Sequence, residues 1–245
     1  MICHIVSHDC KGYHLDLPFS SLFCLPSLCY NVAMHIDTIS QVLATLRTSL
    51  APLSEADSLV DVLEGERPHA RKSAVLVALF EQDGAIHLAF IRRASTLRAH
   101  SGEIGFPGGS YDATDGSLVV TALREAWEEI GLAQERVEIL GLLPPVFTVV
   151  SNFLIVPVVA YLSNGLGQLT LQPAEVAELL LLPLQELADP AIAHTEIWTS
   201  GGRARTVYFY DYGQVRIWGA TARILSSLLA QLAPERDQPE QDVFA

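Results

Sequence analysis

The most informative stretch of the chain is residues 124–132, Arg124-Glu125-Ala126-Trp127-Glu128-Glu129-Ile130-Gly131-Leu132. Wound as a helix, it brings Glu125, Glu128 and Glu129 onto one face, because side chains three and four positions apart are neighbours there. The opposite side is predicted to face the core and carries Leu123, Ala126, Trp127 and Ile130. Spacing alone leaves two alternatives open: a solvated acidic face, or a face that binds a divalent cation through clustered oxygen ligands.

A glycine-rich loop precedes this helix and favours the cation-binding alternative. Gly109 is followed by five residues, then Asp115, then eight residues, and then Arg124-Glu125. The pattern resembles the box of the Nudix hydrolases, which runs Gly, five residues, Glu, seven residues, Arg-Glu-apolar-x-Glu-Glu-x-Gly-apolar. The chain departs from that box in two ways: Asp115 stands where the family usually has Glu, and one extra residue precedes Arg124.

Both departures also occur in one branch of the family, the coenzyme A pyrophosphatase-like proteins. That branch carries a second signature upstream, roughly Leu-Leu-Thr-x-Arg-Ser/Ala, three residues, Arg, three residues, Gly, three residues, Phe-Pro-Gly-Gly. At the same spacings, this chain has Ala89-Phe90-Ile91-Arg92-Arg93-Ala94, Arg98, Gly102 and Phe106-Pro107-Gly108-Gly109. The Leu-Leu-Thr part is degraded, with Ile91 in the Thr position, and the resemblance covers about residues 36–232.

The resemblance implies a fold and a reaction. The fold is α+β, with a mixed β-sheet sandwiched between α-helices. The reaction is metal-dependent hydrolysis of the diphosphate bond of coenzyme A or its thioesters, giving 3′,5′-ADP and a 4′-phosphopantetheine product. One alternative is a Nudix pyrophosphatase for ADP-ribose, a nucleotide sugar or a dinucleoside polyphosphate. Another is a catalytically silent Nudix-fold binding module, although the chain retains all three box carboxylates.

The box residues receive roles from the same resemblance. The implied cofactor is Mg²⁺ or Mn²⁺, and its implied ligands are the box carboxylates, Glu125, Glu128 and Glu129. Glu125 is also a candidate for activating water. The backbone carbonyl of Gly109 is a further candidate ligand, because a residue without a side chain lets the loop approach the ion. Arg124 and Asp115 are expected to form a structural pair that orients the loop, rather than to act as catalytic groups.

The general base is expected outside the box, because Nudix enzymes often place it on a later loop. Glu175 and Glu178 are the carboxylates available there, and Glu175 is preferred because it lies in the loop before a short predicted strand. For either residue, a solvated loop carboxylate remains the alternative.

Substrate contacts are expected from the upstream signature and from a later loop. Arg93 and Arg98 are candidate phosphate ligands, because the planar guanidinium fork suits phosphate oxygens. One of them could instead pair with an acidic residue of the box. His100 is a candidate phosphate ligand as well, with a hydrogen-bonded structural histidine as its alternative. Phe147 is expected to line the adenine or pantetheine pocket.

Composition limits the class of partner. The chain has 245 residues, of which 50% are hydrophobic and 18% charged, so it is not a disordered chain. Its 15 Lys and Arg against 28 Asp and Glu give a net charge of −13, which opposes binding to nucleic acid or to an anionic membrane. The expected partner is a small nucleoside diphosphate derivative, held through bridging metal ions. A homodimer is an open alternative to a monomer.

Residues 1–33 differ in composition from the rest. All four cysteines lie there, and the chain has only two methionines, Met1 and Met34. We therefore expect translation to start at Met34, with residues 1–33 as a non-native or disordered extension. Residues 34–233 are expected to form the Nudix domain and residues 234–245 a disordered tail. The cysteine-free remainder is compatible with a reducing compartment, and a cytoplasmic location is expected.

Hydrophobic periodicity predicts the coarse secondary structure. The predicted helices cover residues 35–50, 118–130, 183–187 and 217–232. The predicted strands cover residues 73–80, 86–91, 137–143, 153–162, 168–171, 179–182 and 206–210. Asp83-Gly84 predicts a hairpin turn between the first two strands.

Overall fold

The computed structural model describes residues 38–55, 69–96, 100–200 and 202–233. The expected extension over residues 1–33 and the expected tail over residues 234–245 lie outside the described residues, as does Arg98.

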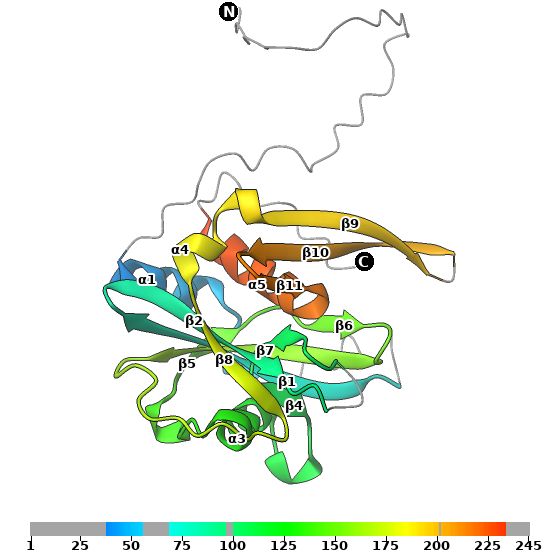
Figure 1. The fold of residues 1–245 in the computed structure, drawn as a ribbon. Coiled ribbons are helices and arrows are strands. Elements are labelled where there is room, and N and C mark those ends of the chain that lie inside the picture. Colours follow the sequence, from blue (N-terminus) through cyan, green and yellow to red (C-terminus); the bar gives the residue numbers. More distant parts are fainter. Residues whose placement is uncertain (1–37, 56–68, 97–99, 201, 234–245) are drawn as a thin grey trace, which may run out of the picture. The chain divides into compact units, whose positions relative to one another are not determined.

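The described strands occur in three runs along the chain, each followed by a helix (Figure 1). The helices are α1 (Ile39–Ser49), α3 (Leu118–Ile130), α4 (Leu184–Leu187) and α5 (Gly219–Leu232). The strands are β1 (Arg71–Gln82), β2 (Ala85–Arg93), β3 (Ile104–Gly105), β4 (Gly108–Ser110), β5 (Glu138–Leu142), β6 (Val146–Thr148), β7 (Phe153–Leu162), β8 (Val176–Pro183), β9 (Ala193–Ser200), β10 (Arg203–Tyr212) and β11 (Val215–Trp218).

Eight of the described strands form one mixed sheet. Its order is β3-β2-β1-β7-β5, while β4 pairs with β1, β6 with β7 and β8 with β2. The long β1–β7 pair is parallel and runs from Arg71 opposite Phe153 to Phe80 opposite Leu162. The other pairs in this sheet are antiparallel. Strand β1 is buried on both faces, which explains its continuous apolar run.

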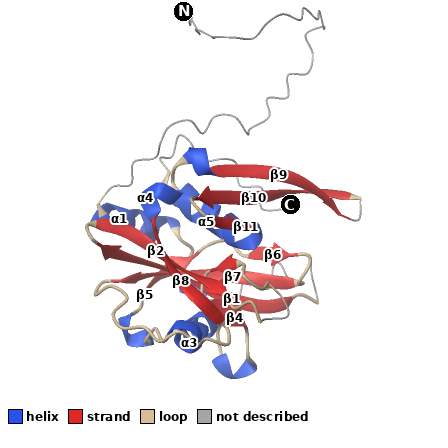
Figure 2. Ribbon diagram, in the orientation of Figure 1, coloured by secondary structure: helices blue, strands red, loops and turns tan. Residues whose placement is uncertain are grey.

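Helices cover both faces of this sheet (Figure 2). Helix α3 packs on one face through Leu118, Ala122, Ala126 and Ile130. On the other face, α1 contributes Leu46 and α5 contributes Leu225 and Leu228 to a second cluster of buried side chains. The expected α+β fold, with a mixed sheet between helices, is confirmed.

The strand predicted at residues 168–171 is wrong. This segment instead supplies backbone donors to the carboxyl end of α3. The Thr170 N–H donates to the Ile130 carbonyl at 3.0 Å, and the Gln172 N–H donates to the Glu129 carbonyl at 2.9 Å. The last carbonyls of a helix lack partners within the helix, so they accept such donors readily. Gly131 makes the close approach tolerable, because a Cβ there would meet the Thr170 amide nitrogen at 2.9 Å.

A second sheet of three strands, in the order β11-β10-β9, follows the main one in the chain. The aromatic alternation of residues 206–210 predicted β10, but β9 was not predicted because its sequence is mostly polar. The final helix also begins later than predicted. Residues 215–218 pair with β10 as β11, and α5 starts at Gly219.

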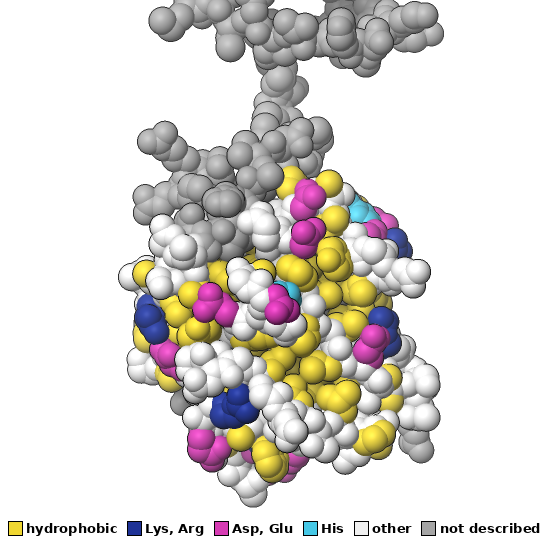
Figure 3. Space-filling model, turned by 60° about the vertical axis from the view of Figure 1, so that its left-hand side comes forward, with side chains coloured by type: hydrophobic (Ala, Val, Ile, Leu, Met, Phe, Trp, Pro, Cys, Tyr) yellow, Lys and Arg dark blue, Asp and Glu magenta, His cyan; other side chains and the backbone are white. Residues whose placement is uncertain are grey.

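The surface gives no sign of a polyanion-binding face on the side seen in Figure 3. Hydrophobic side chains occupy a broad central area there, and acidic and basic groups are scattered around it. In the part of the chain that the structure describes, no helix combines the length and apolar character needed to cross a membrane.

Candidate active site

Helix α3 presents its three carboxylates at graded depth. The side chain of Glu129 is 1% exposed, that of Glu125 is 15% exposed and that of Glu128 is 54% exposed. The gradient follows from helix geometry, because each residue turns by about 100° and Glu129 falls in the middle of the buried stripe. That stripe consists of Leu118, Thr121, Ala122, Ala126, Glu129 and Ile130.

The prediction that Trp127 faces the core is wrong, since this residue is 59% exposed. Trp127 follows Ala126 by one step of the helix, which turns it away from the sheet. The sequence predicted that the carboxylate face and the core face of this helix would be opposite. In the structure the two faces overlap at Glu129.

Glu129 lies against the glycine-rich loop. The Gly108 N–H donates to its Oε2 at 2.8 Å, and Nη1 of Arg93 lies 3.5 Å from its Oε1. Burial raises the pKa of Glu129 to about 7, although the Gly108 donor and Arg93 oppose that rise. A buried carboxylate with a raised pKa is under-compensated, which is common where a ligand completes a site.

Two adjacent glycines make the loop fit. A Cβ on Gly108 would collide with the backbone of β1 at Ala74 and Val75, with which β4 pairs. A Cβ on Gly109 would collide with the carboxyl group of Glu125. The backbone at Gly109 therefore lies directly against a box carboxylate.

Arg124 and Asp115 form a two-pronged ion pair at the start of α3. Arg124 donates from Nε to Oδ1 of Asp115 at 2.7 Å and from Nη2 to Oδ2 at 3.0 Å. Asp115 is buried and also accepts from Thr121 Oγ1 at 2.8 Å and from the Asp112 N–H at 3.1 Å. The hydrogen bonds from Arg124 are the main cause that lowers the pKa of Asp115 to about 2.

The same guanidinium anchors its surroundings. Nη2 of Arg124 donates to the Ser110 carbonyl at 3.0 Å, and Nη1 lies 3.0 Å from both Glu125 Oε1 and Glu128 Oε2. Thr121 was not identified from the sequence as part of this ion-pair network. Its position one helical turn before Arg124, on the buried side of the helix, could have indicated that role, because a buried hydroxyl needs a polar partner.

Arg93 is the opposite case. Its Nε is buried and has no hydrogen-bond acceptor in the described structure. Among the described residues, its ion pair is the 3.5 Å contact with Glu129, which is longer than a charge-assisted hydrogen bond. The neighbouring Arg92 pairs elsewhere, because its Nε donates to Glu178 Oε2 at 2.8 Å across the β2–β8 pair.

The two candidates for the general base, Glu175 and Glu178, differ in their surroundings. Glu178 is engaged with Arg92. Glu175 lies in the turn before β8, where its backbone carbonyl accepts from the Ala94 N–H at 2.8 Å. Burial is the main cause that raises the pKa of Glu125 and Glu129, and the negative charge of Glu175 contributes a smaller rise in the same direction.

The remaining candidates lie in less direct positions. Nδ1 of His100 lies 2.9 Å from Glu103 Oε2, so the histidine has a local protein partner. Its positive φ of 57° fits a tight turn in the loop. Phe147 is half-buried in β6, opposite Leu154 of β7, and packs against the core beneath α3.

The donor set fits a divalent cation, although no three such groups converge ready-made among the described residues. Glu125, Glu129 and Glu175 are mutually unfavourable carboxylates, and burial also raises the pKa of Glu125. Hard cations prefer oxygen ligands of this kind. A bound cation would neutralise the negative charge of these carboxylates, which the 3.5 Å contact between Arg93 and Glu129 only partly balances.

A family model for the NUDIX domain matches residues 70–199 of the 245-residue chain. The chain belongs to the Nudix family. This membership makes it a diphosphate hydrolase of that family and leaves the substrate to be determined.

Individual relatives agree with that assignment. "Uncharacterized Nudix hydrolase NudL" of Photorhabdus laumondii is 41% identical over 145 residues, covering 59% of this chain and 76% of that protein. The protein of the same name from Citrobacter koseri is 34% identical over 180 residues, covering 74% and 92%. The solved structure of a Nudix hydrolase from Alicyclobacillus acidocaldarius is 20% identical, with a TM-score of 0.44, and the match covers 72% of this chain and 98% of that one.

Proposed function

We propose that the chain hydrolyses the diphosphate bond of coenzyme A or its thioesters, releasing 3′,5′-ADP and a 4′-phosphopantetheine product. The observation that carries the proposal is the position of Arg93. This arginine belongs to the upstream signature, yet it lies beside Glu129 of the Nudix box with a buried, unpaired Nε. This contact supports the proposal that the upstream signature and the box serve one site.

The box carboxylates would hold the metal. Glu125, Glu128 and Glu129, with the carbonyl of Gly109, would bind Mg²⁺ or Mn²⁺, whose charge neutralises diphosphate oxygens when it is bound. Glu128 must then leave its 3.0 Å contact with Arg124, which its exposed position permits. Arg124 would keep Asp115 and the Ser110 carbonyl as partners.

Glu175 is our candidate for the general base that accepts a proton from the attacking water. Its support is its electrostatic influence on Glu125 and Glu129 together with its freedom from the ion pair that holds Glu178. A general base must lie within hydrogen-bond reach of the water that it deprotonates, and this proposal requires that position of Glu175.

The substrate phosphates would be bound by arginines. Arg93 offers its unpaired Nε, and Arg98 belongs to the same signature outside the described residues. His100 would help to bind a phosphate only if its ring left the contact with Glu103 and turned to the substrate. Phe147 remains our candidate for the wall of the adenine or pantetheine pocket. We also propose a cytoplasmic location, where a free thiol would stay reduced.

A product assay tests this proposal. The full chain would be incubated with coenzyme A, ADP-ribose or a dinucleoside polyphosphate, with Mg²⁺ or Mn²⁺, and the products identified by mass spectrometry. We expect 3′,5′-ADP to dominate from coenzyme A. Glu128→Gln should be inactive, and Glu138→Gln, which alters a remote carboxylate paired with Arg47, should be fully active.

Other outcomes redirect the proposal. Turnover of ADP-ribose or the dinucleoside polyphosphate alone would retain the box chemistry and reject the coenzyme A assignment. No turnover of any of these substrates would reject the proposed reaction and favour a silent binding module.

A further inference from the structure

The three-stranded sheet carries a row of aromatic rings on one face. His194, Phe209 and Trp218 lie directly opposite one another on β9, β10 and β11. The rings of His194 and Phe209 are stacked with centroids 4.9 Å apart and an interplanar angle of 5°. Those of Phe209 and Trp218 follow at 6.4 Å and 12°. The rings therefore form one continuous stack across the three strands.

Neighbouring groups hold this stack in place. Trp198 packs obliquely on both Phe209 and Trp218, with centroids 6.0 and 5.8 Å away. Arg216 lies over Phe209 at 5.9 Å and is itself held by Asp211 through hydrogen bonds of 2.7 and 3.1 Å. Such mutual packing fixes the rings, so little side-chain freedom remains to be lost when a ligand binds.

The core of the molecule does not account for these rings. Side chains alternate between the faces of a strand, so Tyr208, Tyr210 and Ile217 point to the other face. Those residues pack with α5 in the core that contains Leu225. Phe209 in the middle of the row is buried, whereas Trp198 is exposed and Trp218 is half-buried. The row is therefore enclosed at its centre and open at Trp218.

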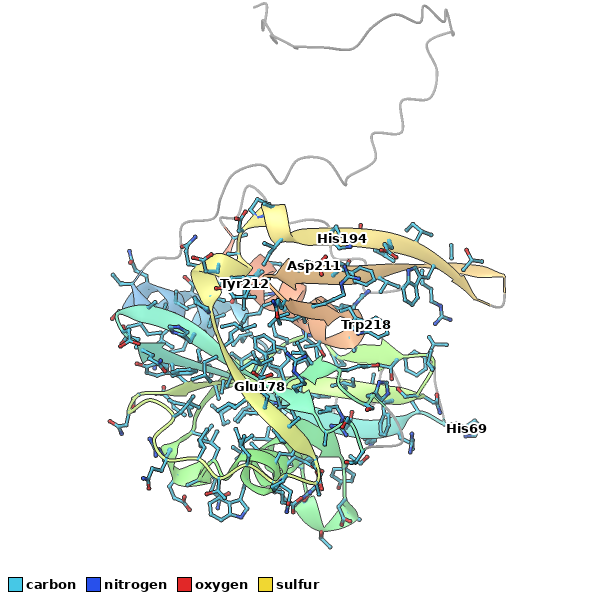
Figure 4. The ribbon with its side chains drawn as sticks, in the orientation of Figure 1. His69, Glu178, His194, Asp211, Tyr212 and Trp218 are labelled. Carbon is cyan, nitrogen blue, oxygen red and sulfur yellow. The ribbon has the colours of Figure 1, made fainter. Side chains whose placement is uncertain are left out.

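The stack ends at the strand that contacts the main sheet. Trp218 lies on β11, an edge strand of its sheet, and β11 contacts β3 of the main sheet. Strand β3 leads within a few residues to Gly108, the donor to Glu129. In Figure 4, Trp218 is drawn on the side of this sheet that faces the main sheet, below His194, Asp211 and Tyr212. The last ring of the row thus lies on the strand that contacts β3, a few residues before the glycine-rich loop in the chain.

We propose that Trp218 is the stacking surface for the purine base of the nucleotide substrate. This inference rests on the proposed function, which supplies a substrate with an adenine ring near the reacting diphosphate. Flat rings prefer offset stacking with centroids about 4.5–7 Å apart, so a purine beside Trp218 would continue the row. Base–aromatic stacking contributes affinity without reading base identity, so the subsite recognises a purine ring rather than coenzyme A specifically.

Tryptophan fluorescence tests the contact without requiring turnover. The chain has three tryptophans, so Trp127→Phe combined with Trp198→Phe leaves Trp218 as the only tryptophan, which is excited selectively at wavelengths that tyrosine does not absorb. Titrated with 3′,5′-ADP in the presence of EDTA, this variant should show saturable quenching. Ribose 5-phosphate, which lacks the base, should leave the emission unchanged. Equal responses to the two ligands, or no response to either, would overturn the inference.

Kinetics supply the second readout. Trp218→Ala should raise KM for the nucleotide substrate about ten- to a hundredfold with a small change in kcat, because stacking is made equally in the ground and transition states. Trp218→Phe should retain most of the affinity and guards against misfolding as the cause. Ile197→Ala, on the opposite face of β9, is the matched control and should leave KM unchanged.

The outcomes separate the two proposals. Hydrolysis of coenzyme A with an unchanged KM in Trp218→Ala rejects the stacking subsite and leaves the proposed function intact. Hydrolysis of ADP-ribose alone, with quenching by 3′,5′-ADP and a raised KM in Trp218→Ala, rejects coenzyme A as the substrate and supports the stacking subsite.

Discussion

The molecule contains two arginine–carboxylate pairs at the same helix, and they are built differently. Arg124 and Asp115 make two short hydrogen bonds, and Asp115 has further donors from Thr121 and the backbone. Arg93 and Glu129 approach only to 3.5 Å, and the Nε of Arg93 has no acceptor among the described residues. The first pair is saturated, whereas the second retains unused donors and a buried carboxylate.

The pKa values report the same difference. The pKa of Asp115 is lowered to about 2, because its partners stabilise the charged form. The pKa of Glu129 is raised to about 7, because burial outweighs its partners. A saturated pair stabilises the fold, and an unsaturated pair is arranged to receive something else. The comparison predicts that mutations at one pair affect stability and at the other affect turnover.

The largest effect is expected from Glu129→Gln. Removing a buried carboxylate that would bind the metal should lower kcat about a thousandfold or more, comparable to the loss of a strong electrostatic contact in a transition state. The amide oxygen of Gln can still accept from the Gly108 N–H, so the thermal midpoint should change little. Steady-state kinetics and thermal unfolding measure both quantities. A kcat close to that of Glu138→Gln would remove Glu129 from the site.

Asp115→Asn should instead act on stability. It leaves Arg124 without its main counter-charge, and breaking a buried pair in this way costs about 3 kcal/mol of unfolding free energy. Urea denaturation measures the loss. Asp211→Asn is the control, because it breaks an equally short but exposed pair with Arg216 and should cost much less unfolding free energy. Equal losses in the two variants would contradict the distinction between buried and exposed pairs.

Arg93→Ala should lower kcat/KM about a hundredfold, because a guanidinium–phosphate contact is charge-assisted and two-pronged. Its unfolding free energy should change little, since the 3.5 Å contact contributes weakly to the fold. Arg93→Lys should recover only part of the activity, because a lysine lacks the planar fork. A fall in stability with unchanged kcat/KM would place Arg93 with the structural pair.

The smallest effect concerns the pH dependence of metal binding. Glu129 must lose its proton to bind a cation, and its pKa of about 7 means that the carboxyl becomes protonated as pH falls below that value. Mg²⁺ should therefore bind more weakly at pH 6 than at pH 8. Its dissociation constant, measured by calorimetry, should be about tenfold larger at pH 6. In Glu129→Gln this pH dependence should disappear. The same dissociation constant at both values in the unmodified chain would exclude Glu129 as a titrating ligand.

Much of the site could be predicted from residues close in the chain. The i, i+3, i+4 spacing of Glu125, Glu128 and Glu129 depends only on helix geometry. The pairing of Arg124 with Asp115 spans nine positions and is present in the structure. By contrast, the strand expected at residues 168–171 lacks the pairing that a sheet requires, and its backbone serves α3 instead.

The depth of each carboxylate could not be predicted in the same way. A helical pattern gives the angles between side chains, but the packing of α3 on the sheet decides which angle points inward. For this reason Glu129 is buried and Trp127 is exposed, the reverse of what their polarity suggested.

By itself, the sequence determined the elements that depend on local chemistry: the glycines of the loop, the carboxylate spacing of the helix and the long apolar strand β1. Only the tertiary structure decided which distant groups meet. Arg92 engages Glu178, 86 positions away, because of the β2–β8 register, and Arg93 therefore remains for Glu129. The aromatic row of β9, β10 and β11 depends on register as well. Local periodicity sets the direction of a side chain, whereas its partner depends on how remote segments pair.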